Sequence, residues 1–234
     1  MRLNKYIAQA GIASRRKADE LTKNGNVKVN GQVVTEMGYD VMPDDRVEVN
    51  GRVVVPAETF VYYMMNKPKG FITSMKDDKD RPTVMDLMTD VPVRVFPVGR
   101  LDYNTTGLLL LTNDGDLANK LAHPEHEVGK TYRAKVAGVV SKKRLAMLRR
   151  GVDIGGFVTS PAEVHVVKQT EKSAIIELTI HEGKNRQVRR MCKAVGCPVK
   201  ELQRIAIGEL YLARLKEGHY RKLKKEEIDY LKNL

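Results

Sequence analysis

The segment Gly99 to Gly107 carries the residue types with which this chain could act chemically on a substrate. It reads Gly-Arg-Leu-Asp-Tyr-Asn-Thr-Thr-Gly and lies between an apolar run that ends at Val98 and another that starts at Leu108. Loops between strands often hold catalytic groups, and a carboxylate such as Asp102 can serve there as a base or a nucleophile. An Asp beside Asn, Thr and Gly is also a common turn-former. Composition alone therefore favours a turn at Asp102 over a nucleophile.

A basic helix is the second feature with chemical potential. At about 100° per residue, the apolar residues between Gln187 and Val195 fall on one face, and basic residues occupy the opposite face. The helix follows Gly183-Lys184-Asn185-Arg186, so a polyanion there would meet cationic side chains and the positive end of the helix dipole. Solvated helix faces usually mix charges of both signs. The absence of acidic residues in this stretch therefore favours an anion-binding surface.

Several other chemistries lack their sequence patterns. Gly129-Lys130-Thr131 has no glycine five positions earlier, as a P-loop requires, and no G-x-S-x-G occurs. The histidines and glutamates between His123 and Glu127 lack the H-E-x-x-H spacing, which favours a solvated loop over a metal site. Cys192 and Cys197 are too few for a disulfide framework or a zinc site. We expect both to be reduced thiols.

Charge and length narrow the class of protein. The 234 residues include 41 Lys plus Arg and 29 Asp plus Glu, a formal net charge of +12, which makes nucleic acid the leading partner. At roughly 150 residues per domain the chain holds one or two domains. No run approaches the roughly 18 apolar residues of a membrane span, and Lys5, Gln9 and Arg15 interrupt any signal-like stretch. We expect a cytoplasmic protein with no targeting segment and no membrane partner.

The first third predicts a small helix–helix–hairpin module. Helical spacing from Leu3 to Ala10 pauses at Gly11, and Ser14 can cap a second helix that ends near Asn24-Gly25. Two Asn-Gly pairs between alternating apolar residues, within 27–34 and 47–54, predict β-hairpins. Residues 1–34 hold seven basic and two acidic residues, whereas 35–58 hold two basic and six acidic residues. The basic surface of this module is therefore confined to one face or edge of it.

The remainder predicts a larger mixed α/β domain after a linker at Pro56 to Thr59, where the apolar alternation stops before Phe60. The strands that we expect are Phe60–Met65, Val93–Val98, Leu108–Thr112, Tyr132–Val136, Ala174–Ile180 and Val199–Ile207. The helices that we expect are Leu117–Leu121, Lys142–Leu148 and Gln187–Val195. The domains expected are 1–58 and 59–234.

Five segments of the chain carry recognisable patterns: residues 1–31, Asn66-Lys67-Pro68-Lys69-Gly70, Gly99 to Leu109, Lys130-Thr131-Tyr132 and Glu182 to Met191. Together they resemble the bacterial ribosomal pseudouridine synthases of the RsuA/RluB type, which carry an N-terminal S4-like RNA-binding domain. The first segment looks like that S4 domain and the second like the first motif of the catalytic domain. The third resembles the motif with the family's essential aspartate, the fourth resembles the K-x-Y motif, and the fifth resembles the third motif. The resemblance spans essentially the whole chain and reverses the preference for a turn at Asp102.

The resemblance implies an α+β fold, with a small S4-like domain before a catalytic domain that has a mixed, mainly antiparallel sheet flanked by helices. It implies isomerisation of a uridine in RNA to pseudouridine, with no cofactor and no metal. The base must leave the RNA stack to reach a side chain, and Tyr132 would stack on it. Asp102 would act as the essential carboxylate, and an adjacent guanidinium favours a charged carboxylate. Arg189 is our choice for that partner, with Arg186 one turn away as the alternative.

The resemblance also implies a ribosomal RNA stem-loop as the partner, bound by a monomer. The residues expected to contact RNA are Arg2, Lys5, Arg15, Arg16, Lys17, Arg100, Lys184, Arg186 and Arg190. The amino-acid sequence around the third motif is more similar to that of the enzymes that modify large-subunit (23S) RNA than to that of the small-subunit (16S) enzyme. A non-catalytic RNA-binding or ribosome-assembly factor is the alternative from another class. It would need no carboxylate in a basic groove.

Overall fold

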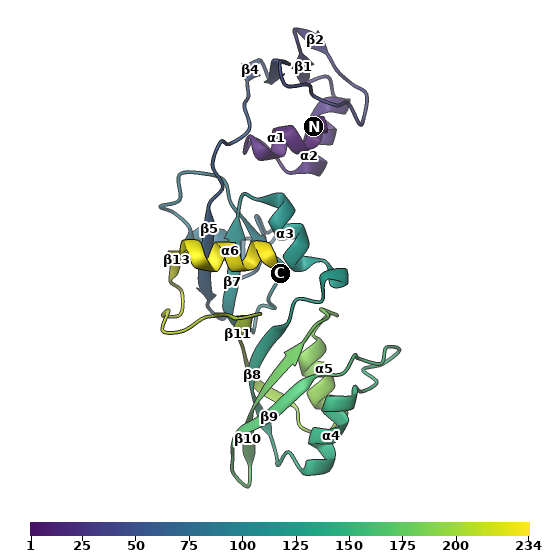
Figure 1. Cartoon of the computed structure of the whole chain (residues 1–234), viewed down its shortest axis with the longest axis vertical. Coiled ribbons are helices and arrows are strands. Elements are labelled where there is room, and N and C mark those ends of the chain that lie inside the picture. The colour runs from purple at the N-terminus through teal and green to yellow at the C-terminus, as the bar shows by residue number, and fades with distance from the viewer. The chain divides into compact units, whose positions relative to one another are not determined.

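The computed structural model describes residues 1–234, except for the side chain of Pro124. The chain forms two compact units (Figure 1). The first unit comprises Met1–Val61 with the short segments Val91–Val95 and Asn113–Gly115, and the second unit comprises the rest.

Two helices and a four-stranded antiparallel sheet make up the first unit. The elements are α1 (Leu3–Gln9), α2 (Arg15–Lys23), β1 (Val27–Val29), β2 (Gln32–Val33), β3 (Val47–Val49) and β4 (Arg52–Val53), with the strand order β2-β1-β3-β4. Ser14 caps α2, because its side chain accepts a hydrogen bond from the Lys17 amide at 3.2 Å. Asn30-Gly31 and Asn50-Gly51 all have positive φ, as two-residue hairpin turns require. Both predicted helices and both predicted hairpins are confirmed.

A nine-stranded mixed sheet forms the centre of the second unit. Its main path runs β13-β5-β7-β11-β8-β10-β9, with β12 beside β11 and β6 beside β7. The strands are β5 (Tyr62–Lys67), β6 (Phe96–Val98), β7 (Thr106–Thr112), β8 (Lys130–Ala137), β9 (Glu163–Gln169), β10 (Ser173–Ile180), β11 (Val199–Ile207), β12 (Leu210–Tyr211) and β13 (Tyr220–Lys222). Only β7 and β11 pair in parallel among the described strands, so the sheet is mainly antiparallel, as predicted.

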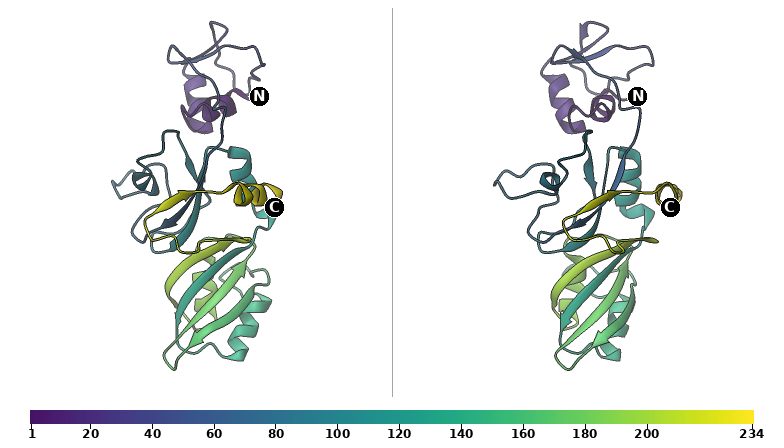
Figure 2. Two further views of the ribbon diagram at one scale, coloured as in Figure 1. Left: turned by 60° about the vertical axis from the view of Figure 1, so that its left-hand side comes forward. Right: turned by 90° about the vertical axis from the view of Figure 1, so that its left-hand side faces the viewer.

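Helices pack against both ends of this sheet. They are α3 (Gly115–Ala122), α4 (Lys142–Arg150), α5 (Gln187–Ala194) and α6 (Lys225–Asn233), with short 3-10 helices at Val84–Leu87 and Pro124–His126. Figure 2 shows α3 and the yellow α6 together on one side of β5 and β7. There Leu121 and Leu231 join Met64 and Leu110 in one buried cluster. At the other end of the sheet, α5 packs on β11 and α4 on β9.

One strand prediction is wrong at its start. Residues 93–95 form no strand, and β6 begins at Phe96. Pro92 lies directly before this segment, and Pro97 inside β6 has no amide hydrogen to donate, which suits it to a short strand at the edge of a sheet. The helices α3, α4 and α5 lie where the sequence predicts them. No helix of the described residues is long and apolar enough to cross a membrane.

Candidate active site

The loop between β6 and β7 presents Asp102 and is fixed through its backbone. The Thr73 hydroxyl donates to the Leu101 carbonyl at 2.9 Å and accepts from the Leu101 amide at 3.2 Å. The Thr105 amide donates to the Asp102 carbonyl at 3.0 Å, which closes a turn around the aspartate. These contacts determine where the Asp102 side chain points without using its carboxylate.

Lys67, at the end of β5, supports the same turn from inside the protein. Its side chain is fully buried, and its amine donates to the carbonyls of Thr105 at 3.0 Å, Asp102 at 3.2 Å and Pro68 at 3.0 Å. Burial lowers the pKa of Lys67 to about 8, although the negative charges of Asp102 and Glu217 partly oppose that shift. All three amine hydrogens are thus used when the lysine is charged.

Two arginines from the region of α5 face the Asp102 carboxylate. The Arg186 Nη1 atom lies 3.5 Å from Asp102 Oδ2, and the Arg189 Nε atom lies 4.0 Å from the same oxygen. The Arg189 side chain is 13% exposed and that of Arg186 is 48% exposed. Arg189 also donates to the Asn104 carbonyl at 2.8 Å and to the Thr105 hydroxyl at 3.2 Å. Both predicted partners therefore approach Asp102, and Arg189 is the one built into the loop.

A pocket of about 540 Å³ opens beside this aspartate. Among the residues that line it are Asp102, Tyr132 and Arg186, brought together from the loop, from β8 and from the start of α5. Tyr132 is only 9% exposed, so one part of its ring surface is all that a ligand could contact. Burial and the charge of Arg186 both lower the pKa of Arg189. The pocket thus combines one carboxylate, two guanidinium groups and an aromatic ring.

The other residues of the second unit that are predicted to contact RNA have different surroundings. Lys184 lines the pocket, with its amine 4.6 Å from the centre of the Phe157 ring, and the exposed Arg100 also lines the pocket. Arg190 instead donates to the carbonyls of Ile154 and Gly155, so it connects α5 to a neighbouring turn.

The basic residues predicted to contact RNA in the first unit are spread over two elements. Arg2, before α1, hydrogen-bonds the Gly38 carbonyl and lies 3.5 Å from Asp40. Lys5 lies in α1 and is half-buried. Arg15, Arg16 and Lys17 form the exposed first turn of α2, where Lys17 pairs with Glu20 at 2.7 Å.

Comparison with protein-family models gives two matches. Residues 61–194 match the model of RNA pseudouridylate synthases, and residues 1–47 match the S4 domain. The chain belongs to the RNA pseudouridylate synthase family. This synthase is 50% identical over its full length to a *Bacillus subtilis* protein named ribosomal large subunit pseudouridine synthase B, of which it covers 96%.

Two further relatives agree with this membership. An *Aquifex aeolicus* protein named as an uncharacterized RNA pseudouridine synthase is 44% identical over 99% of this synthase and 93% of its own length. A crystal structure of a pseudouridylate synthase superposes with a TM-score of 0.71 at 33% identity, and the match covers 99% of each chain. The family, the α+β fold and the enzyme class are therefore as predicted.

Sequence reasoning missed several residues that shape the pocket of this synthase. Arg81 lines the pocket and forms a two-point contact with Asp77, at 3.0 Å and 2.8 Å, which keeps the pKa of that carboxyl well below its usual range. Thr73, Lys67 and Arg204 also contribute. Lys67 lies in one of the recognised motifs. Its position at the end of the apolar run of β5 was the signal that could have marked it as a supporting residue. Thr73 and Arg204 had none, because only the fold places them beside the loop.

Proposed function

We propose that this synthase converts a uridine of large-subunit ribosomal RNA to pseudouridine, with the target base flipped out of the RNA into the pocket. One observation carries the proposal. Asp102 faces two arginines in the pocket that Tyr132 also lines, in a chain of this enzyme family. The large-subunit substrate is supported by the name of the *Bacillus subtilis* relative.

The proposed reaction moves one bond and needs no group from outside the RNA. The N1–C1′ bond of uridine breaks, the uracil turns, a C5–C1′ bond forms, C5 loses its proton and N1 gains one. Asp102 is the group that attacks the ribose, attacks the ring or removes a sugar proton. All three routes use the same carboxylate. Arg189 and Arg186 would balance its charge before and after the step.

Tyr132 is proposed to hold the flipped base. Extrusion of a base costs a few kcal/mol, and stacking on an aromatic side chain returns about 1–3 kcal/mol per base. The buried position of Tyr132 fixes its ring before the substrate arrives. Arg100, at the pocket and exposed, would occupy the place that the base leaves or bind a nearby phosphate.

The remaining assignments concern the whole chain. We assign residues 1–58 as the S4-like RNA-binding domain and 59–234 as the catalytic domain, acting as a monomer in the cytoplasm. The S4 domain would hold a structured stem-loop through Arg2, Lys5, Arg15, Arg16 and Lys17, while Lys184, Arg186 and Arg190 would approach the RNA near the target. RNA affinity would then come mostly from phosphate contacts, whereas the chemistry would take place at Asp102.

The test uses purified protein with unmodified large-subunit and small-subunit ribosomal RNA in separate reactions. Pseudouridine is mapped by chemical adduct formation and primer extension, with Asp102→Asn alongside. We expect one new stop on the large-subunit RNA, no stop with Asp102→Asn, and RNA affinity of that variant within a few fold of wild type. Turnover by Asp102→Asn would contradict the role of Asp102.

Small-subunit ribosomal RNA is the alternative substrate. A stop on both RNAs, or on the small-subunit RNA alone, would replace the large-subunit assignment. Binding without conversion of either RNA, or of assembly intermediates, would favour a non-catalytic factor.

A further inference from the structure

Arg204 is a buried cation in the pocket that the proposed chemistry leaves unused. It lies on β11, is 3% exposed and lines the pocket. Its Nε atom donates to the Leu108 carbonyl at 2.8 Å. Its Nη2 atom is buried and has no hydrogen-bond partner among the described residues. Burial of a charged group without an acceptor is costly, so an oxygen atom from outside the protein is the expected partner.

Strand register places Arg204 beside a second cation, Lys130. Arg204 faces Tyr132 across the β11–β8 ladder, and Lys130 precedes Tyr132 by two residues on β8. Residues two apart on a strand point to the same face, as do residues directly opposite one another. Arg204, Tyr132 and Lys130 therefore enter the pocket from one face of the sheet, and all three line it.

Lys130 has the surroundings of an anion-binding group. Its half-buried amine donates to the Val128 carbonyl at 3.0 Å. Burial and the positive charge of Arg204 both lower its pKa. Neither Lys130 nor Arg204 forms an ion pair with a carboxylate among the described residues. Two neighbouring cations without a counter-charge favour an anion over a neutral carbonyl group.

The spacing along β8 suits a nucleotide. Two residues of a strand span about 6.6 Å, which is comparable with the reach from a base to the phosphate of its own nucleotide. A base stacked on Tyr132 would thus place its backbone near Lys130. RNA phosphates are the anions that such a substrate brings into the pocket.

We propose that Lys130 and Arg204 form a phosphate subsite that binds the RNA backbone next to the flipped uridine. Arg204 supplies fixed charge at the base of the subsite, and Lys130 supplies a movable donor at its side. The inference rests on the proposed function, because it requires a uridine in the pocket. It gives the lysine of the K-x-Y motif a role of its own beside that of the tyrosine.

The experiment measures binding of a stem-loop transcript from unmodified large-subunit RNA as a function of salt. Removal of one phosphate contact lowers the slope of log K against log[salt] by about one. We expect that loss for Lys130→Met, with affinity at low salt weaker by about tenfold. Lys130→Arg should restore the slope, and thermal unfolding checks that each variant is folded. Arg204→Lys, which keeps the charge in a buried position, should retain most of the slope.

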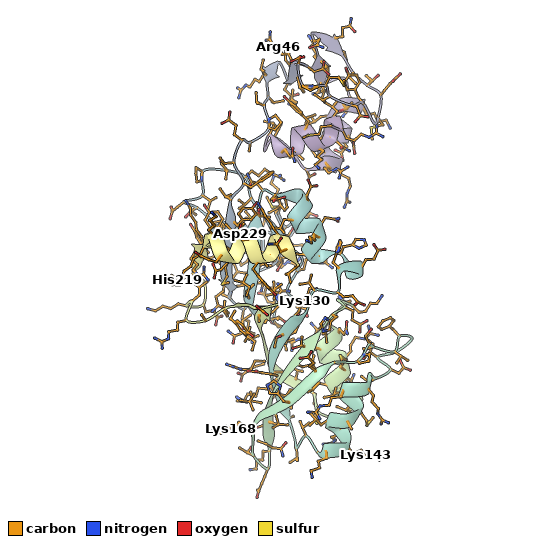
Figure 3. All side chains as sticks on the ribbon, in the orientation of Figure 1. Arg46, Lys130, Lys143, Lys168, His219 and Asp229 are labelled. Atoms are coloured by element: carbon orange, nitrogen blue, oxygen red, sulfur yellow. The ribbon has the colours of Figure 1, made fainter. Side chains whose placement is uncertain are left out.

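A second arm locates the phosphate. In the same stem-loop, a neutral methylphosphonate replaces the phosphate on either side of the converted uridine. One of these substitutions should weaken binding by wild type about tenfold and have no further effect on Lys130→Met, since coupled changes are not additive. The matched control is Lys168→Met, which removes an exposed charge from β9 outside the pocket (Figure 3) and should keep the full methylphosphonate effect.

The outcomes separate this subsite from the proposed function. An unchanged salt slope in Lys130→Met, or an additive methylphosphonate effect, would overturn the subsite. A further RNA carries a thio-substituted uracil at the target uridine. If binding responds to that change and to neither methylphosphonate, these cations contact the base, and the phosphate subsite is also overturned. Failure of wild type to convert the transcript, with the slope loss intact, would contradict the proposed function and the position of the phosphate next to a flipped uridine, while the phosphate contact of Lys130 would remain.

Discussion

Asp102 is positioned by contacts to its neighbours more than by contacts to its own carboxylate. Lys67, Thr73 and Arg189 bind backbone or hydroxyl groups of residues 101–105. A loop fixed in this way holds the carboxylate in one place before substrate binds, and such preorganisation is what electrostatic catalysis requires. The three supporting residues come from separate parts of the chain, so the site depends on the whole second unit.

Arg189 and Arg186 should differ in which kinetic constant they affect. Arg189 is mostly buried and bonded to the loop, whereas Arg186 is half exposed beside the pocket. We expect Arg189→Lys, which loses the planar fork, to lower kcat at least tenfold more than Arg186→Lys does. Arg186→Lys should chiefly raise KM. Single-turnover assays at saturating RNA make the comparison, and an equal fall in kcat for both variants would contradict the ranking.

Lys67→Met should destabilise the protein by roughly 3 kcal/mol, because three carbonyl acceptors around a buried amine lose their donor. The effect should depend on pH. The pKa of Lys67 is about 8 in the folded protein against 10.5 for an ordinary lysine, so the unfolded chain binds more protons between these values. The unfolding free energy of wild type relative to Lys67→Met should therefore rise with pH from about 8 to 10.5, by at most about 1.4 kcal/mol per pH unit.

Denaturant unfolding of both proteins at several pH values measures this difference. Lys69→Met, an exposed neighbour two residues away, is the control and should show neither the destabilisation nor the pH dependence. A difference between wild type and Lys67→Met that stays constant from pH 7 to 10.5 would show that the lysine keeps an ordinary pKa.

At the scale of elements, the parallel pair β7–β11 connects the aspartate loop to the pocket wall. Thr106 and Gly107 open β7 directly after the loop and pair with Gln203 and Arg204. Gly107 has φ +109°, and a Cβ atom there would lie 2.2 Å from the Arg204 carbonyl oxygen. No side chain fits that approach, so the glycine sets the distance between the two strands.

Gly107→Ala should therefore cost about 3 kcal/mol or more of folding stability, since both the backbone angle and the neighbouring backbone oppose it. Gly115→Ala is the matched control, because no atom lies within 4 Å of the added Cβ and the residue starts helix α3. That change should be neutral or slightly stabilising. Urea unfolding compares the two, and similar stabilities would contradict the close approach described for Gly107.

Sequence patterns predicted the elements whose signals are local and missed those that depend on the fold. The Asn-Gly turns, the Ser14 cap and the apolar face of α5 were all readable, because each rests on neighbouring residues. Strand β9 was missed, since only Val164 of its seven residues is buried and no alternation shows. The strand register that brings Arg204 beside Tyr132 could not be predicted from the sequence either. It arises from pairing between segments more than seventy residues apart.

At the scale of the whole molecule, one cluster of positive charge lies where it does not help the fold. Arg15, Arg16 and Lys17 occupy the first turn of α2, at the positive end of the helix dipole. Cations in that position disfavour a helix by about 0.3–1 kcal/mol each. They lie in the part of the first unit that is rich in basic residues, whereas residues 35–58 are mainly acidic. Exposed cations in a position that does not stabilise their own helix favour an RNA-binding role over a structural one.

Replacing all three residues by Gln should therefore weaken RNA binding without weakening the fold. The slope of log K against log[salt] should fall by up to about three, KM for the RNA should rise, and kcat at saturating RNA should stay within about twofold, since Asp102 belongs to the other unit. Arg46→Gln with Arg52→Gln, in the acidic part of the first unit, is the control and should leave the slope nearly unchanged. Because removal of cations from a helix N-terminus favours the helix, thermal stability should hold or increase. A stability loss together with unchanged salt dependence would mean that these residues support α2 and do not contact RNA.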